Sequence, residues 1–315
     1  MASAGTQPRA SAARALIERV MRDGQSAAAE SPLIFGGAHG RPSGRLVSLA
    51  QGERVLSACA ILVRDAQLAS GARLRLGLIG WVATDPAARR RGLASQVLTA
   101  AEAELAAAGC ELALLWADDP EFYRRRGYLD LGTERDLALD ASSLRRLPAW
   151  EGPGRATRAL DPQADAGATL GLYRGQPAHV RRTLTEHAAL LGANRMRGRV
   201  ATQDGAAVAY ALEGRGGDLQ GVVHEWSGDP EAVLGLQREL AGAALERGER
   251  AFVIGPGHEH PVCAAWEALD LAPTLGTLGM GRGLGASDRP SPSALHPPRA
   301  AEVSRRGLFL WGLDS

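Results

Sequence analysis

The segment "GWVATDPAARRRGLASQVLTAAEAEL", residues 80–105, constrains the fold of this chain more than any other. An apolar strand ends at Thr84, a turn follows at Asp85-Pro86, and Gly92 opens an alanine-rich helix with one apolar face. The first N–H groups of a helix have no partner within it, and the helix dipole adds positive potential there. Three consecutive arginines beside such a turn can clasp a diphosphate through paired hydrogen bonds. The segment therefore predicts an anion site at a strand-to-helix turn.

The surrounding pattern places this turn in an α/β domain. Apolar strands precede it, and a short buried strand follows the alanine-rich helix. The segment "DPEFYRRRG" then begins a second helix, with Asp119 as its cap and Pro120 in its first position. Further strands close the unit. We expect an α/β fold with a mixed sheet, and a first domain over residues 1–145.

The second half of the chain repeats this order. Residues 146–164 are rich in Pro and Gly, which predicts a linker. Beyond it, strands and helices follow one another as in the first half, so we expect a duplicated domain over residues 165–315 that ends in a docked apolar strand, "LFLWGLDS". In place of the arginine turn, this half has Asp229 and Glu231 at a helix start, where carboxylates repel a diphosphate. The second domain is expected to be degenerate and to bind no cofactor.

Composition narrows the class of protein. The chain has 315 residues and a net charge of +1, and all 36 of its basic residues are arginine. This balance argues against a broad nucleic-acid or membrane footprint. The three cysteines are far apart, so they predict neither a disulfide framework nor a zinc site. No segment has the pattern of a signal peptide or a membrane span. We expect a cytoplasmic monomer or homodimer without a membrane or nucleic-acid partner.

Two motifs, in this order, resemble one known family. The spacing Arg89-x-x-Gly92-x-Ala94 resembles the motif Q/R-x-x-G-x-G/A that binds acetyl-coenzyme A (acetyl-CoA) in the GNAT (GCN5-related N-acetyltransferase) superfamily. Downstream, "PEFYRRRGY" resembles the F-Y-x-x-x-G-F helix of that family. The likeness covers roughly residues 45–130. It implies an N-acetyltransferase that moves an acetyl group from acetyl-CoA directly to a primary amine of a small molecule or peptide.

The second half contains "LYRGQPAHVRRTLTEHAALL" followed by "VATQDGAAVAYAL". In these segments it loosely resembles the non-catalytic domain of tandem GNAT proteins. Among these are the "enhanced intracellular survival" type aminoglycoside acetyltransferases. The resemblance implies a tandem GNAT architecture, in which only the first domain binds acetyl-CoA.

The resemblance also implies roles for individual residues. Backbone groups of Val82 and Thr84 would pair with the pantetheine arm of the cofactor, and N–H groups from Arg90 to Ser95 would hold its diphosphate. Tyr123 would lie near the cofactor sulfur and donate a proton or a hydrogen bond to the leaving thiolate. The alternatives are a tyrosine that only packs its helix and an arginine loop that is only solvated. The implied cofactor-binding residues are Val82, Ala83, Thr84, Arg89, Arg90, Arg91, Gly92, Leu93, Ala94 and Ser95.

The general base is missing from its usual place. Many GNAT enzymes carry a glutamate on the central strand, whereas "LRLGLIGWVA" has no carboxylate. Some tandem members use the terminal carboxylate of the chain, which here implies Ser315, with Asp314 as the fallback. The alternative is that the last strand only completes the second sheet. Asp118, at a strand end, is a candidate for orienting the substrate.

Two histidine-containing segments have competing interpretations. In "HEW", only one of His224 and Glu225 can face a given cleft, so Glu225 is either a substrate contact or part of a satisfied buried pair. In "GPGHEHP", His258 and His260 have a spacing that metals sometimes use. No third ligand is evident, which favours a loop or cap role and predicts no metal site.

Two other functions stay open. The missing base favours a non-catalytic acyl-CoA-binding sensor. The arginine runs allow a nucleic-acid adaptor, although the near-neutral charge disfavours it. The chain has no Walker-type phosphate loop and no strand-linked G-x-G-x-x-G motif. The identity of the acceptor amine lies beyond the sequence, because substrate-facing loops vary freely.

Overall fold

The computed structural model describes residues 7–36, 44–257 and 259–285. The elements of the first half are α1 (Gln7–Met21), α2 (Ala27–Glu30), α3 (Pro32–Phe35), β1 (Gly44–Gln51), β2 (Arg54–Gln67), β3 (Arg73–Thr84), the short 3-10 helix η1 (Pro86–Ala88), α4 (Leu93–Ala107), β4 (Leu112–Leu115), α5 (Pro120–Arg124), β5 (Leu129–Ala138) and α6 (Ala141–Leu144). Those of the second half are β6 (Arg155–Ala159), α7 (Ala166–Arg174), β7 (His179–Val180), α8 (Leu184–Leu191), β8 (Arg197–Gln203), β9 (Ala206–Glu213), β10 (Val222–Gly228), α9 (Pro230–Glu246), β11 (Phe252–Pro256), α10 (Pro261–Ala268) and β12 (Thr274–Gly283).

One mixed sheet runs through both halves. Its strand order is β1-β2-β3-β4-β12-β5-β11-β10-β9-β8-β6, and β7 pairs with β2 outside this path. Strands β3 and β4 are parallel, as are β10 and β11. A long helix, α4 or α9, connects each parallel pair, as a crossover connection requires. This mixed α/β architecture confirms the predicted fold class.

Two strands exchange places at the centre of the sheet. Strand β12 comes from the second half, yet it lies between β4 and β5 of the first half, with Met280 opposite Leu115 and Gly276 opposite Glu134. Strand β5 in turn pairs with β11 of the second half. The expected boundary at residue 145 therefore falls between strands of one continuous sheet.

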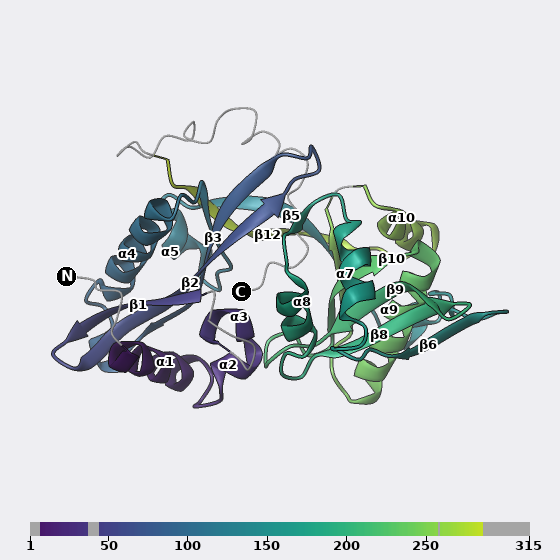
Figure 1. Ribbon diagram of the computed structural model, residues 1–315, viewed down its shortest axis with the longest axis horizontal. Helices are drawn as coiled ribbons and strands as arrows, with labels where there is room; N and C mark the ends of the chain where they lie inside the picture. Colours follow the sequence, from purple (N-terminus) through teal and green to yellow (C-terminus); the bar gives the residue numbers. More distant parts are fainter. Residues whose placement is uncertain (1–6, 37–43, 258, 286–315) are drawn as a thin grey trace.

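Helices cover both faces of the sheet (Figure 1). Along β2, Ala60 and Leu62 face a core shared with α1, α2 and α3, whereas Cys59 and Ile61 face a core shared with α4. This division follows from the alternation of side chains along a strand. In the second half, α9 packs on β8, β9 and β10, while α7 packs on β9 and β10. Helices α3 and α8 are in contact, so the two halves also meet in the helical layer.

Three predicted positions lie outside the described residues: His258, Asp314 and Ser315, the last two with the terminal apolar segment. None of the helices within the described ranges combines the length and the hydropathy that a membrane crossing requires.

Candidate functional site

Strand β3 separates from β4 partway along its length. In the described structure the two strands pair over residues 76–78 only. On its other side β3 stays paired with β2 as far as Thr84, across a register shift in which Ala83 pairs with Ala58 but Gly80 pairs with Ala60. The extra residue forms a β-bulge, which bends a strand and increases its twist. One edge of β3 therefore lacks a strand partner beyond the bulge.

The bulge sets which groups line this open edge. Trp81 has a left-handed backbone with φ of 56°, and both Trp81 and Ala83 are buried. Val82 and Thr84 are half-buried. A free strand edge hydrogen-bonds readily to an extended chain that contains amides, and the pantetheine arm is such a chain. The edge at Val82 and Thr84 therefore fits the role that the family resemblance implies.

Asp85 anchors the loop that follows β3. Its Oδ1 accepts from Ala87 N at 3.0 Å, and its Oδ2 pairs with Arg54 at 3.0 Å and with Arg19 at 3.5 Å. The hydrogen bond from Arg54, foremost, holds the pKa of the Asp85 carboxyl below its usual range. Asp85 therefore fixes the loop to β2 and α1 as a carboxylate.

The loop itself forms a concave surface of main-chain N–H groups. Arg90 and Gly92 both have left-handed backbones, with φ of 61° and 73°. The first internal hydrogen bond at the start of α4 runs from Gln96 N to Gly92 O at 3.1 Å. Across the described ranges, no main-chain N–H from Arg90 to Ser95 donates to a protein acceptor. Successive free N–H groups in such a turn make an anion-binding concavity.

The surroundings of the concavity also suit a diphosphate. Arg89, Arg90 and Arg91 are exposed, and none of them has an ion pair with another described residue. A Cβ atom placed on Gly92 would meet only the Gln96 side chain, at 4.0 Å. The space above the start of α4 is thus open and bordered by cations.

Tyr123 of helix α5 packs against the same hydrophobic cluster as Val82 of the open edge. Asp119 caps the helix by accepting from Phe122 N at 3.3 Å, as predicted. The Tyr123 ring packs edge-on against that of Tyr128, with centroids 5.8 Å apart. Burial raises the pKa of Tyr123 to about 12, so its hydroxyl stays protonated at neutral pH. Within the described structure this hydroxyl makes no hydrogen bond, so Tyr123 both packs its helix and keeps a proton to donate.

Sequence reasoning missed the carboxylate that holds this region together. Glu102 on α4 accepts from the Tyr128 hydroxyl at 3.1 Å, from Arg126 at 3.3 Å and from Arg282 of β12 at 2.9 Å. It fastens the end of α5 and the exchanged strand β12 to the helix that follows the anion loop. In the sequence Glu102 reads as one of several polar residues on a helix, and only the fold brings its partners together.

The corresponding opening in the second half is filled. Strands β10 and β11 pair over residues 222–223 and 252–253, and beyond them the Trp226 indole donates to Ile254 O at 2.9 Å. The Gln176 amide donates to Trp226 O at 3.3 Å. Side chains of Trp226 and Gln176 thus hydrogen-bond to main-chain carbonyl groups of β10 and β11 beyond the paired residues.

Helix α9 begins without an anion site. The Asp229 side chain caps it by accepting from Ala232 N at 3.0 Å. This carboxylate accepts one of the N–H groups at the helix start and places a negative charge there, which disfavours a diphosphate. The geometry agrees with a second half that binds no cofactor.

Glu225 lies in the core and not at an open cleft. Both its oxygens accept from Arg182, at 3.1 and 2.8 Å, and Oε1 also accepts from the Tyr210 hydroxyl at 2.8 Å. Arg182 is the main cause that lowers the pKa of Glu225 to about 2 against the opposing effect of burial. Of its two interpretations, the geometry fits the satisfied buried pair.

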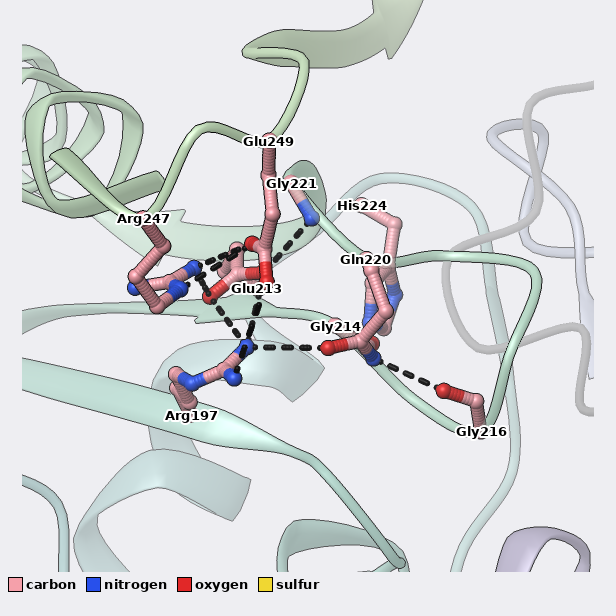
Figure 2. A network of polar contacts seen from close by, with 9 residues as sticks. All are labelled: Arg197, Glu213, Gly214, Gly216, Gln220, Gly221, His224, Arg247 and Glu249. Atoms are coloured by element: carbon pink, nitrogen blue, oxygen red, sulfur yellow. Dashed lines mark hydrogen bonds and ion pairs between the residues drawn. The ribbon is translucent and has the colours of Figure 1, made fainter. Parts of the chain in front are cut away.

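His224 and His260 both make structural hydrogen bonds. His224 donates from Nε2 to Gly214 O at 2.7 Å (Figure 2), and burial lowers its pKa to about 4. His260 caps α10 by accepting from Val262 N at 3.2 Å, which confirms a cap role. Within the described ranges, no group of three or more His, Cys, Asp or Glu side chains is arranged to hold a metal ion.

Asp118 follows β4 on the route to α5, and its side chain is exposed. Its charge contributes to the raised pKa of Tyr123, so the two side chains share one region. A role for Asp118 in orienting the acceptor stays a prediction.

Comparison with known proteins agrees with this geometry. Residues 11–129 match the family described as acetyltransferase (GNAT) domain. A probable N-acyltransferase from Enterococcus faecalis V583 has a TM-score of 0.66 and 13% identity, with 90% of this chain and 72% of that chain covered. Eis1 from Mycobacterium abscessus has a TM-score of 0.57 and 17% identity, covering 89% and 72%.

A tandem GNAT protein from the clavulanic acid biosynthesis pathway has a TM-score of 0.53 and 16% identity, with 79% of this chain and 86% of that chain covered. No curated protein matches the sequence. At such identities the structural likeness shows the fold alone. Residues 11–129 carry an acetyltransferase (GNAT) domain, and the chain as a whole has the fold of GNAT proteins.

Proposed function

We propose that this protein is an acetyl-CoA-dependent N-acetyltransferase that acts on a primary amine of a small molecule or peptide. The observation that carries the proposal is the anion loop at Arg90–Ser95, placed beside the free edge of β3. GNAT enzymes use acyl-CoA cosubstrates, and the match over residues 11–129 supports that chemistry here.

The residues of the loop and the strand edge would bind and orient the cosubstrate. N–H groups of Arg90–Ser95 and the guanidinium groups of Arg89–Arg91 would hold the diphosphate. Val82, Ala83 and Thr84 would align the pantetheine arm along β3, so that its thioester lies beside Tyr123. A bound diphosphate is dianionic, which matches the exposed arginines.

In the transfer itself, the acceptor amine attacks the thioester carbonyl carbon, a C–N bond forms and the C–S bond breaks. Tyr123 would give its proton to the departing sulfur. The amine must lose one proton, and we propose the Ser315 carboxylate, or Asp314, as its acceptor. Asp118 would orient the amine; we do not extend this role to Glu225, whose oxygens are occupied.

We further propose a tandem arrangement of residues 1–145 and 165–315, in which the second GNAT-like half binds no cofactor. Residues 146–164, expected to be a linker, contribute β6 (Arg155–Ala159), which pairs with β8 of the second half. The filled opening at Trp226 and the acidic helix start at Asp229 support this arrangement. Cys59, Cys110 and Cys263 are free and buried, which is consistent with a reducing cytoplasm. A monomer or homodimer fits the proposal equally well.

The test combines binding and turnover. Isothermal titration calorimetry with CoA and acetyl-CoA should detect binding, and a panel of amines should release free thiol from acetyl-CoA. Absence of CoA binding would remove the proposal. Tight binding with only slow thioester hydrolysis across the whole panel would favour the second candidate, a non-catalytic acyl-CoA sensor, which the lack of a carboxylate in β3 supports.

A further inference from the structure

We propose that Arg22 is a positioning residue for the open edge of β3, and that the second half of the chain supplies part of the binding site that holds the Arg22 side chain. The inference rests on the proposed function, because the strand it positions is the edge of β3 assigned to acyl-CoA. It gives the second half a role in cofactor binding although that half binds no cofactor itself.

Trp81 is the residue that forms the bulge in β3. Its left-handed backbone is strained for an ordinary L-residue, so surrounding contacts must maintain it. The ring is buried and packs edge-on against Phe35, with centroids 5.3 Å apart. The Arg22 guanidinium lies over the same ring, 4.5 Å from its centroid. Arg22 and Phe35 therefore hold the side chain that sets the bulge.

Arg22 is itself held by a carboxylate of the first half and one of the second. Its Nε and Nη2 donate to both oxygens of Glu30, at 2.8 and 2.7 Å, and Nη2 also donates to Asp218 at 2.5 Å. The Arg22 side chain is 15% exposed, and the hydrogen bond to Glu30, foremost, raises its pKa. A lysine could not satisfy this geometry, because it lacks the planar fork of donors.

The loop that carries Asp218 closes over this ion pair. Glu30 is 8% exposed, and Gly216 approaches it so closely that an added Cβ would lie 2.0 Å from its carboxyl carbon. The same loop is tied to α2 through Asn194, whose N–H donates to Ala29 O and whose carbonyl accepts from Gly216 N, each at 2.8 Å. Contacts from the second half thus cover Glu30, whereas the Asp218 side chain stays 70% exposed.

A separate network keeps that loop in place (Figure 2). Glu213, fully buried at the end of β9, accepts from Gly221 N at 2.7 Å, from Arg197 at 3.2 Å and from Arg247 at 3.0 Å. Gln220 accepts from Arg197 at 3.1 Å and donates to Gly216 O at 2.8 Å. The loop is therefore braced at both ends, and its contact with Arg22 is a fixed feature of the fold.

The chain of contacts runs from Glu213 through the loop to Arg22, Trp81 and the open edge at Val82. Disturbing Arg22 should relax the bulge, which turns the edge of β3 away from the position that the pantetheine arm needs. The effect should fall on acyl-CoA affinity, because the open edge at Val82 and Thr84 is the part of the proposed site that would bind the pantetheine arm.

Arg64 provides a matched control. It also joins the halves, through Glu186 at 2.6 Å and Arg181 O at 3.0 Å, and its side chain is 5% exposed. It does not touch Trp81. Arg64→Lys should therefore lower stability in the way Arg22→Lys does without altering the bulge.

The test measures CoA affinity by calorimetry and amide hydrogen exchange over residues 81–84 in full-length protein. Arg22→Lys should weaken CoA binding about fivefold or more and lower protection of these amides about tenfold. Arg64→Lys should leave both within about twofold. Asp218→Asn should cause part of the loss of CoA affinity and amide protection. The double variant Arg22→Lys/Asp218→Asn should lose little more than Arg22→Lys alone, because both substitutions act on the same ion pair.

Unchanged affinity and unchanged exchange in folded Arg22→Lys would overturn the inference, as would an equal effect of Arg64→Lys. If wild-type protein binds no CoA, the proposed function fails. The exchange measurement then still decides whether Arg22 holds the bulge.

Discussion

Substitution of Gly92 tests the anion loop most directly, because the structure separates its effect on folding from its effect on binding. With φ of 73°, any other residue at this position costs about 1–2 kcal/mol. The substituent meets nothing of the protein except the Gln96 side chain at 4.0 Å. Gly92→Ala and Gly92→Glu should therefore destabilise the fold to a similar degree, by a few degrees in Tm.

Their effects on CoA binding should differ strongly. A glutamate carboxylate about 5 Å from one charge of the diphosphate gives a repulsion of about 3 kcal/mol at an effective dielectric constant of about 20. Salt and solvent reduce this figure, so we take about half of it as the minimum. The affinity of Gly92→Glu for CoA should then fall at least about tenfold below that of Gly92→Ala.

Gly109, at the other end of α4, is the matched control. It too has a left-handed backbone, with φ of 79°, and an added Cβ would meet only the Arg75 side chain, at 4.0 Å. Gly109→Glu should lower Tm in the same way and leave the CoA affinity unchanged. Calorimetry on the three variants decides the matter: equal CoA affinity in Gly92→Glu and Gly109→Glu would refute the placement of the diphosphate.

Three further predictions concern proton transfer and buried charge. Tyr123→Phe should lower kcat about 100-fold, since general acids contribute about that much or more, with CoA affinity within twofold; equal kcat would leave Tyr123 only a packing role. Glu225→Gln should lower the free energy of unfolding by about 3–5 kcal/mol by unpairing buried Arg182, as denaturant titration would reveal; intact stability with a raised KM for the amine would instead restore its substrate role. Burial raises the pKa of Glu134 to about 7, so this carboxyl makes folding less favourable as pH rises from about 4.5 to 7. The increase in Tm caused by Glu134→Gln should therefore grow over that pH interval, and an increase that does not change with pH would contradict the prediction.

The parts of the site that follow from local sequence were predictable. The strand end at Thr84, the helix that Gly92 opens and the cap at Asp119 depend on neighbours a few residues away, and each has its own backbone signal. The bulge at Trp81 was not predictable, because nothing in a run of apolar residues marks where one of them turns left-handed.

The contacts that brace the site were beyond the sequence for a different reason. Glu102 joins Arg126 and Arg282, and Arg22 joins Asp218, across long separations in the chain. Such pairs are fixed by tertiary packing and produce no periodic pattern in the sequence. The succession of strands and helices along the second half was predicted. The position of β12 between β4 and β5 of the first half was not, because the order of strands along the chain does not determine which strands the last one joins.

The exchange of β5 and β12 has a consequence for how the polypeptide must be assembled. Until residues 274–283 leave the ribosome, β4 has no neighbour on one side, and its main-chain groups are a template for pairing with other chains. Pairing β4 with β12 joins residues far apart in the chain, such as Leu115 and Met280, and contacts of such long sequence separation form slowly during folding. We therefore expect nascent or truncated forms that stop before β12 to aggregate, and the complete polypeptide to reach its native state late in synthesis.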